Sequence, residues 1–330
     1  MSGDEDELTE HSLARTVRTL VPEFVRQRYA LKFGLVLLVM GVSIAGIGLL
    51  ATEKISTETA DNVENEYRSV AETETSIIEG WLRQNRLSTK YISQTPILQQ
   101  NDSLATRQTL TAEQYELGES AHALYLVNKT DAGDVRLVST TGDTASGTSL
   151  SGGPRAWVTS RLSGPLNLTD SDVILNETYT VDGRQVVGFL SPVANVDGRF
   201  LVVEIGVAGI TTQLQGQERA EGGFTQIVST DNNRVVIAEN ADSVGSQYAD
   251  SESAREPLSK ANALRAETTG AGVMSSMAAN SVLDSDYAVG YAPVQGTDWV
   301  VATHAPRSSV FGFVQTISNW GLFATIAAVL

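Results

Sequence analysis

The sequence contains no cysteine, only five lysines and only three histidines. Without cysteine the chain cannot form disulfides, thiolate nucleophiles or cysteine-ligated metal sites. The histidines, His11, His122 and His304, are far apart in the sequence, which argues against a histidine-based catalytic or metal site. A GKS or GKT phosphate loop is also missing. We therefore expect no enzyme, no metal site and no cofactor.

Basic residues are few relative to acidic ones, and the chain carries a net charge of −16. Most of this charge lies in residues 53–307, which hold 33 acidic and 18 basic residues. Such an acidic surface argues against nucleic acid as a partner. It suits concentrated salt, where counterions screen the repulsion between carboxylates. The composition favours a halophilic source, with an ordinary acidic surface as the alternative.

Two runs of residues lack any charged side chain, at 33–52 and at 308–330. The first has twenty residues, enough for a helix to cross about 30 Å of hydrocarbon. A buried core helix or a signal peptide is the alternative, but the 32 preceding residues are too many for a signal peptide. Basic residues precede this run and acidic residues follow it. The positive-inside rule therefore places residues 1–32 in the cytoplasm and residues 53–307 outside the cell membrane.

The second run is more polar at its start, and we expect Trp320 to mark a membrane interface. Only eleven residues remain from that tryptophan to Leu330, too few to cross a membrane. We expect residues 308–330 to be a juxtamembrane segment and an incomplete second membrane helix, so that the chain is a fragment or truncated product.

Between the two runs the sequence pattern changes from helical to strand-like. Residues 53–95 predict one long extracellular helix, because apolar side chains recur at three- and four-residue steps and Pro96 follows. Its apolar stripe packs on the domain or pairs with a second subunit in a homodimer. Short β patterns separated by turn residues then predict antiparallel strands at 122–128, 135–140, 177–181, 185–192, 199–207, 224–230, 234–239, 272–277, 286–293 and 298–305, with helices at 155–162 and 251–266.

The strand pattern occurs twice. GFLSPV at 188–193 resembles GYAPV at 290–294, and each precedes a turn and a further strand. An internal duplication accounts for this, with coincidence as the alternative. The expected fold class is therefore α+β, with a membrane-distal domain at 96–215 and a membrane-proximal domain at 216–307.

This order of elements resembles the double Cache sensor module, two PAS-like domains in tandem. IVSTDNNRVVIAENADSVGSQYAD (227–250) and YAVGYAPVQGTDWVVATHAP (287–306) are similar to the membrane-proximal half of such modules. The composition and the N-terminal residues before the first uncharged run most resemble those of haloarchaeal transducers of the methyl-accepting chemotaxis family. The resemblance covers roughly residues 12–330. Because the module occurs on several kinds of signalling protein, it identifies the input and not the output.

The resemblance implies a ligand site in the distal domain, where amino-acid-binding members use an Arg-x-Trp-Tyr motif, an earlier tyrosine and an aspartate. Arg155 and Trp157 match the motif, Tyr179 matches a further pocket tyrosine, and Glu204 stands where the aspartate is expected. The sequence departs from the motif at two positions, with Val158 and Leu150 in place of tyrosines. An arginine can bind a carboxylate through two hydrogen bonds, and an indole offers an apolar wall. Glu204, if buried, needs a partner, either a ligand ammonium group or Arg155.

Each of these residues also has an ordinary structural interpretation: a solvated arginine, a core tryptophan and a surface-facing glutamate. Four N-x-S/T sequons in the outward segment predict N-glycosylation: Asn101, Asn128, Asn167 and Asn176.

The sequence thus predicts the sensing part of a two-pass chemoreceptor. It would bind a small molecule such as an amino acid or an organic acid and pass a helix displacement through the second membrane helix. By resemblance, a cytoplasmic histidine kinase would be reached only through a missing C-terminal region. The alternatives are the input region of a sensor histidine kinase and a membrane-tethered binding or adhesion module without output.

Overall fold

The computed structural model describes residues 29–163, 172–217, 220–266 and 270–312, with only part of the side chains between residues 29 and 56. Residues 63–310 form one compact unit, which contains two antiparallel sheets and the C-terminal part of a long helix. The α+β class and the two sheets are therefore confirmed.

The long helix, α3, runs from Tyr29 to Ser93. It ends three residues before Pro96, whose ring disfavours helical backbone at the residue before it. The predicted extracellular helix thus continues the uncharged run at 33–52 without a break.

No helix among the described residues contains a stretch long and apolar enough to count as a membrane span. The predicted span at 33–52 lies partly outside the described side chains, and the predicted second span lies outside the described residues beyond Gly312.

The first sheet follows α3 through two short helical segments, η1 (Pro96–Gln99) and α4 (Ser103–Leu117). Its strands have the order β2-β1-β6-β5-β3, and β4 pairs with β5. Their bounds are β1 Ala121–Lys129, β2 Val135–Thr140, β3 Ile174–Leu175, β4 Tyr179–Val181, β5 Arg184–Pro192 and β6 Arg199–Gly206. Between β2 and β3 the chain forms η2 (Gly153–Arg155) and α5 (Ala156–Ser163).

After β6, helix α6 (Ala208–Gln215) leads to a second sheet with the order β8-β7-β11-β10-β9. Both sheets therefore arrange their strands in the same sequence, as an internal duplication predicts. The strands are β7 Phe224–Ser229, β8 Val235–Ala238, β9 Gly272–Met277, β10 Tyr287–Pro293 and β11 Trp299–Pro306. The connecting helices are η3 Ala241–Ser243, η4 Ser253–Arg255 and α7 Glu256–Ala266.

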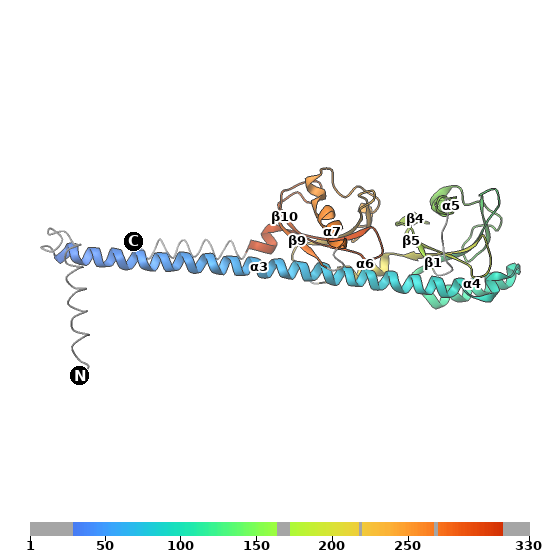
Figure 1. The fold of residues 1–330 in the computed structure, drawn as a ribbon, viewed down its shortest axis with the longest axis horizontal. Coiled ribbons are helices and arrows are strands. Elements are labelled where there is room, and N and C mark those ends of the chain that lie inside the picture. The colour runs from blue at the N-terminus through green and yellow to red at the C-terminus, as the bar shows by residue number, and fades with distance from the viewer. Residues whose placement is uncertain (1–28, 164–171, 218–219, 267–269, 313–330) are drawn as a thin grey trace, which may run out of the picture. The chain divides into compact units, whose positions relative to one another are not determined.

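Each sheet packs one face on α3 (Figure 1) and the other on its own short helices. On the α3 face, the ring of Trp81 meets the edge of Phe189 at a centroid distance of 6.0 Å. On the opposite face of the first sheet, α5 buries Val158 and Leu162 against the strands. Because both faces are covered, polar strand residues on either face are enclosed and need partners.

The second sheet lies directly against the backbone of α3. A Cβ at Gly290 would lie 2.6 Å from the Tyr67 carbonyl oxygen, so only glycine allows this approach. Two turns further along α3, Glu74 is fully buried, and the hydroxyls of Thr225 and Thr303 donate to its carboxylate. These contacts fix the register of α3 on the second sheet.

The segment that follows α3 is held by Arg199 on β6, which is only 6% exposed. Its guanidinium donates to the carbonyl oxygens of Leu98 and Gln100 at 2.9 Å, and to the side-chain oxygens of Asn101 and Asn128 at 2.7 and 3.0 Å. A single arginine thereby joins the turn after α3 to two strands of the first sheet.

Candidate functional site

A buried ion pair lies on the face of the first sheet that points away from α3. Glu204, near the end of β6, has no exposed surface. Arg155, the last residue of η2, reaches it with two hydrogen bonds, from Nε to Oε1 at 2.7 Å and from Nη2 to Oε2 at 3.0 Å. This two-point contact is the strongest arrangement available to an arginine and a carboxylate.

Two tyrosines complete the buried polar cluster. The hydroxyl of Tyr179, on β4, donates to Glu204 Oε1 at 2.8 Å. Tyr125, on β1, accepts a short hydrogen bond from Arg155 Nη2, and its ring lies 4.5 Å from the guanidinium carbon. The guanidinium is therefore bound by charge on one side and by an aromatic face on another.

Burial and the nearby charge of Glu204 both raise the pKa of Tyr125 and Tyr179. Both hydroxyls are consequently protonated at neutral pH. Burial lowers the pKa of Arg155, but the hydrogen bonds and charge of Glu204 more than offset this, so that its pKa is raised. Arg155 therefore keeps its positive charge although the cluster is largely buried.

Trp157 covers the cluster from α5. A Cβ at Gly188 of β5 would come within 2.3 Å of its indole ring, so glycine at this position makes room for the tryptophan. The rings of Trp157 and Tyr179 lie 6.0 Å apart. The indole N–H is buried and lowers the pKa of the Tyr179 hydroxyl, but its geometry is not that of a hydrogen bond.

The structure thus brings together the four residues that the sequence singled out: Arg155, Trp157, Tyr179 and Glu204. The surface-facing interpretation of Glu204 is wrong, because helices cover both sheet faces. Val158 and Leu150, which replace the expected tyrosines, are both buried in the core beside the cluster. Sequence reasoning missed Tyr125, although its place on a buried strand with alternating side chains could have identified it.

His122 was also missed as a member of this region. Its Nε2 atom lies 4.0 Å from Glu204 Oε2 and 3.5 Å from Asp182 Oδ2, and its side chain is 13% exposed. It stands between the buried carboxylate and the outside of the domain.

The sequons fall in different surroundings. Asn101 is exposed before α4, whereas Asn128 lies within β1, and both side-chain oxygens accept from Arg199. Asn176 donates through Nδ2 to the carbonyl oxygen of Glu177 at 3.1 Å. Asn167 lies outside the described residues. Glycosylation at these positions stays a prediction.

The second sheet has a histidine where the first has Glu204. Glu204 pairs with Gly188 across β5 and β6, four positions from the pair Pro192–Phe200. In the second sheet His304 pairs with Val289 across β10 and β11, and this pair is also four positions from the pair Pro293–Val300. The glycines in GFLSPV and GYAPV are therefore offset by one position and face opposite sides of their sheets.

Aromatic side chains fill the space around His304. Phe224 stacks on the imidazole at 4.8 Å, and Tyr248 and Tyr287 pack at 5.7 and 5.8 Å. The Tyr248 hydroxyl lies 2.8 Å from His304 Nε2. Burial lowers the pKa of His304 to about 3, so the ring is neutral. This region of the second domain is a packed core, which leaves the first domain as the better candidate for a ligand site.

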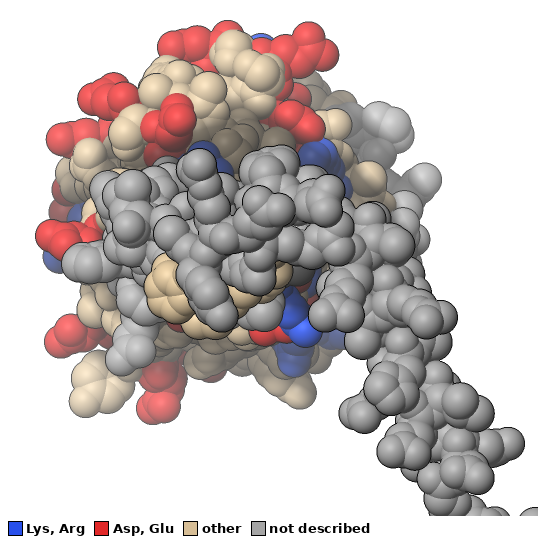
Figure 2. Space-filling model, turned by 90° about the vertical axis from the view of Figure 1, so that its left-hand side faces the viewer, with Lys and Arg blue, Asp and Glu red and all other residues tan. Residues whose placement is uncertain are grey.

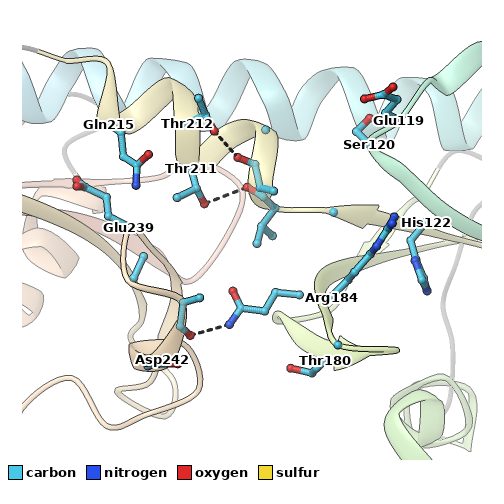
Figure 3. A pocket seen from close by; sticks show the side chains of 18 residues that line it. Glu119, Ser120, His122, Thr180, Arg184, Thr211, Thr212, Gln215, Glu239 and Asp242 are labelled. Carbon is cyan, nitrogen blue, oxygen red and sulfur yellow. Dashed lines mark hydrogen bonds between the residues drawn. The ribbon is translucent and has the colours of Figure 1, made fainter.

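A cleft of about 830 Å³ opens beside the buried cluster, between the two sheets (Figure 3). Its wall on the first domain includes His122, Arg184 and the start of α6, and its wall on the second includes Glu239 and Asp242. His122 therefore borders both the cleft and the buried ion pair.

Two antiparallel sheets along one long helix make up a fold that is also found in chemoreceptor ligand-binding domains. The fold is shared with the ligand-binding domain of Pseudomonas fluorescens chemoreceptor CtaA, solved with L-isoleucine, at a TM-score of 0.54 and 15% identity over 77% of this chain and 96% of that one. The domain of Pseudomonas aeruginosa chemoreceptor PctB, solved with L-Arg, has a TM-score of 0.53 and 16% identity over 78% of this chain and 93% of that one.

In sequence, the chain is similar to transducer proteins of Halobacterium salinarum. It is 29% identical to transducer protein CosT over 88% of this chain and 24% identical to transducer protein BasT over 91%. The chain spans about a third (35%) of the length of either relative. No family model matches it.

These similarities confirm the resemblance to haloarchaeal chemotaxis transducers and to the sensor domains of chemoreceptors. The relatives are transducers and receptor domains rather than enzymes or sensor kinases. The domain boundaries and the site residues stay predictions.

Proposed function

We propose that this chain is the extracellular sensor region of a chemotaxis transducer and that its membrane-distal domain binds a small carboxylate-bearing solute at Arg155. The observation that carries the proposal is the two-point contact between Arg155 and the fully buried Glu204, enclosed by Trp157 and two tyrosines.

An α-amino acid matches this pair chemically. Its carboxylate can replace Glu204 on the guanidinium, and its ammonium group can take the carboxylate of Glu204 that is released. The ammonium and carboxylate groups of an α-amino acid lie close together. This spacing suits Arg155 and Glu204, whose Nε and Oε1 atoms are 2.7 Å apart. Two chemoreceptor domains of this fold were solved with amino acids, which supports the same ligand class. Trp157 would supply the apolar wall for the side chain.

Calorimetry on the purified chain at high salt, titrated with a panel of amino acids and organic acids, tests the proposal. Arg155→Ala should abolish binding of a carboxylate ligand, because the substitution removes the guanidinium that recognises it. Arg155→Lys should weaken binding about tenfold or more, because an ammonium group cannot make the two-point contact. Arg161→Ala, an exposed arginine on α5, is the matched control and should leave affinity unchanged.

Removal of Arg155 alone leaves Glu204 buried without its cationic partner, which costs about 3–5 kcal/mol and can prevent folding. The double variant Arg155→Gln with Glu204→Gln removes both charges and avoids this penalty. Unchanged carboxylate affinity in a folded double variant would refute the proposed site.

The membrane placement is part of the same proposal. Residues 33–52 would cross the membrane, with residues 1–32 in the cytoplasm and residues 53–307 outside. Large apolar side chains on the described part of this run are 44–68% exposed on α3, which supports a lipid environment: Phe33, Leu35, Val36, Leu37, Leu38, Val39, Met40 and Val42.

The output would follow β11. This strand pairs with β7 and β10 and leads directly into a helix that begins at Arg307 and is described to Gly312. A displacement of β11 on ligand binding would be passed to residues 313–330 and from there to a cytoplasmic histidine kinase. A homodimer, paired along α3, would give that displacement a fixed reference.

A further inference from the structure

We infer that the cleft between the two sheets is a second binding site, for a small solute with an ammonium group at one end and a carboxylate at the other. This site is separate from the Arg155–Glu204 pair and would bind a ligand of a different shape. Its volume of about 830 Å³ is within the range of small-molecule sites, about 300–1,000 Å³.

The arginine that lines the cleft and two of its carboxylates lie on opposite walls. Arg184 and His122 lie on the wall formed by the first sheet, and Glu239 and Asp242 lie on the wall formed by the second (Figure 3). Glu119 adds a third carboxylate on the first wall. With three carboxylates against one arginine, the lining is acidic, so a ligand needs a cationic group, and Arg184 provides the partner for an anionic one.

The neutral polar groups contribute less to recognition. Thr211 and Thr212 of α6 donate to carbonyl oxygens four residues earlier in the chain, as Figure 3 shows. Glycines at 183, 206 and 209 leave room beside the charged side chains. Selectivity therefore depends on the two charged walls.

The arrangement of charge separates the ligands of the two sites. Arg155 and Glu204 touch each other and suit a ligand with adjacent charges. In the cleft Arg184 and the two carboxylates of Glu239 and Asp242 belong to different walls, so a ligand that contacts both walls must carry its charges at separate ends, as an ω-amino acid does.

A ligand in the cleft would link the two sheets. Two polar contacts already join them, from Gln185 Nε2 to the carbonyl oxygen of Ala241 at 2.7 Å and from Asn232 Nδ2 to the carboxylate of Glu177 at 2.8 and 2.9 Å. A solute that bridges Arg184 and Asp242 would favour the arrangement in which these contacts form. Because His122 borders both sites, occupancy of one should change affinity at the other.

Calorimetry on the whole chain in detergent micelles at constant salt, with 5-aminopentanoate as the probe, tests the inference. The probe should bind, while pentanoate and pentylamine, which each lack one charge, should bind about tenfold more weakly or not at all. Asp242→Asn and Arg184→Gln should each weaken the probe about tenfold, with Asp250→Asn and Arg83→Gln as exposed controls that leave it unchanged.

The double variant Arg155→Gln with Glu204→Gln should still bind the probe, which separates this site from the distal one. The inference fails if 5-aminopentanoate does not bind the folded chain, or if its affinity survives both cleft substitutions. Loss of binding in the double variant would also overturn it, because the probe would then occupy the distal site.

Discussion

At the scale of single residues, small side chains determine where the large ones lie. Gly188 allows Trp157 to reach the sheet, and Gly290 allows α3 to pack against β10. When the two strand pairs are aligned on Pro192 and Pro293, the two glycines are offset by one position. They therefore lie on opposite faces of their sheets. In the first domain the glycine leaves room for the tryptophan that covers the polar cluster. In the second domain it allows the sheet to pack closely on α3.

We predict that Gly188→Ala destabilises the protein by about 1–3 kcal/mol, because the added methyl group overlaps the indole of Trp157. Chemical denaturation followed by circular dichroism measures this. In a Trp157→Ala background the same substitution should cost much less, since the obstructing ring is gone. Equal costs in both backgrounds would show that Trp157 does not pack over this glycine.

His304 gives the protein a pH dependence that belongs to the second domain. Its folded pKa of about 3 is below the ordinary value of about 6.5, so the unfolded chain binds more protons between these values. Stability is therefore full above pH 6.5 and falls as the pH is lowered toward 3.

Between pH 7 and pH 5 this one group should lower the free energy of unfolding by about 2 kcal/mol. Denaturant titrations at pH 7, 6 and 5, a range above the ordinary pKa of carboxylates, measure the slope. His304→Gln should flatten the dependence, whatever its effect on stability at pH 7. His122→Gln is the control at a partly exposed histidine. An unchanged pH dependence of the free energy of unfolding in the His304 variant would contradict its assignment to this residue.

At the scale of elements, α3 has separate faces along its length. One face is buried, with Ile78 and Leu82 packed in the core, and Glu74 is bound by two threonines of the second sheet. Leu87 and Tyr91, one turn apart, are 48% and 70% exposed instead. The stripe that the sequence left open, for packing on the domain or for pairing with a second subunit, packs on the domain at least as far as Leu82.

The exposed pair supports a test of the proposed homodimer. Tyr91→Asp, with a second variant Leu87→Asp, should weaken self-association about tenfold or more, because each buries a charge in an apolar contact. Analytical ultracentrifugation of the purified chain measures it. Arg83→Asp, exposed on the same helix, serves as the control, and an unchanged dimer in both apolar-site variants would exclude this face as the contact.

At the scale of the whole molecule, charge is the dominant feature. Acidic side chains are spread over the described surface in Figure 2, with few basic ones between them. The relatives come from Halobacterium salinarum, which agrees with the halophilic source that the composition predicted.

We predict that the thermal midpoint of unfolding rises with salt, because counterions screen the repulsion among the carboxylates of a chain with a net charge of −16. Differential scanning calorimetry from dilute buffer to molar potassium chloride measures this rise. Sucrose at matched water activity is the control for general solvent effects. Equal midpoints in dilute buffer and in molar salt would refute the prediction.

The sequence alone predicted the long helix, the main strands and the order in which they occur. Alternating apolar residues and turn pairs located the main strands, because each strand encodes its pattern locally. The long helix was predictable for the same reason. The sequence did not reveal α4 and α6, whose apolar faces are short and whose polar residues resemble loops.

Only the tertiary structure decided what the candidate residues do. Arg155 and Glu204 are 49 residues apart, and whether they bind a ligand or each other depends on the register of β6 and on where η2 places the arginine. The same holds for the cleft, whose two charged walls come from different sheets. Such contacts depend on distances between segments far apart in the chain, and a local pattern of residues carries no information on those distances.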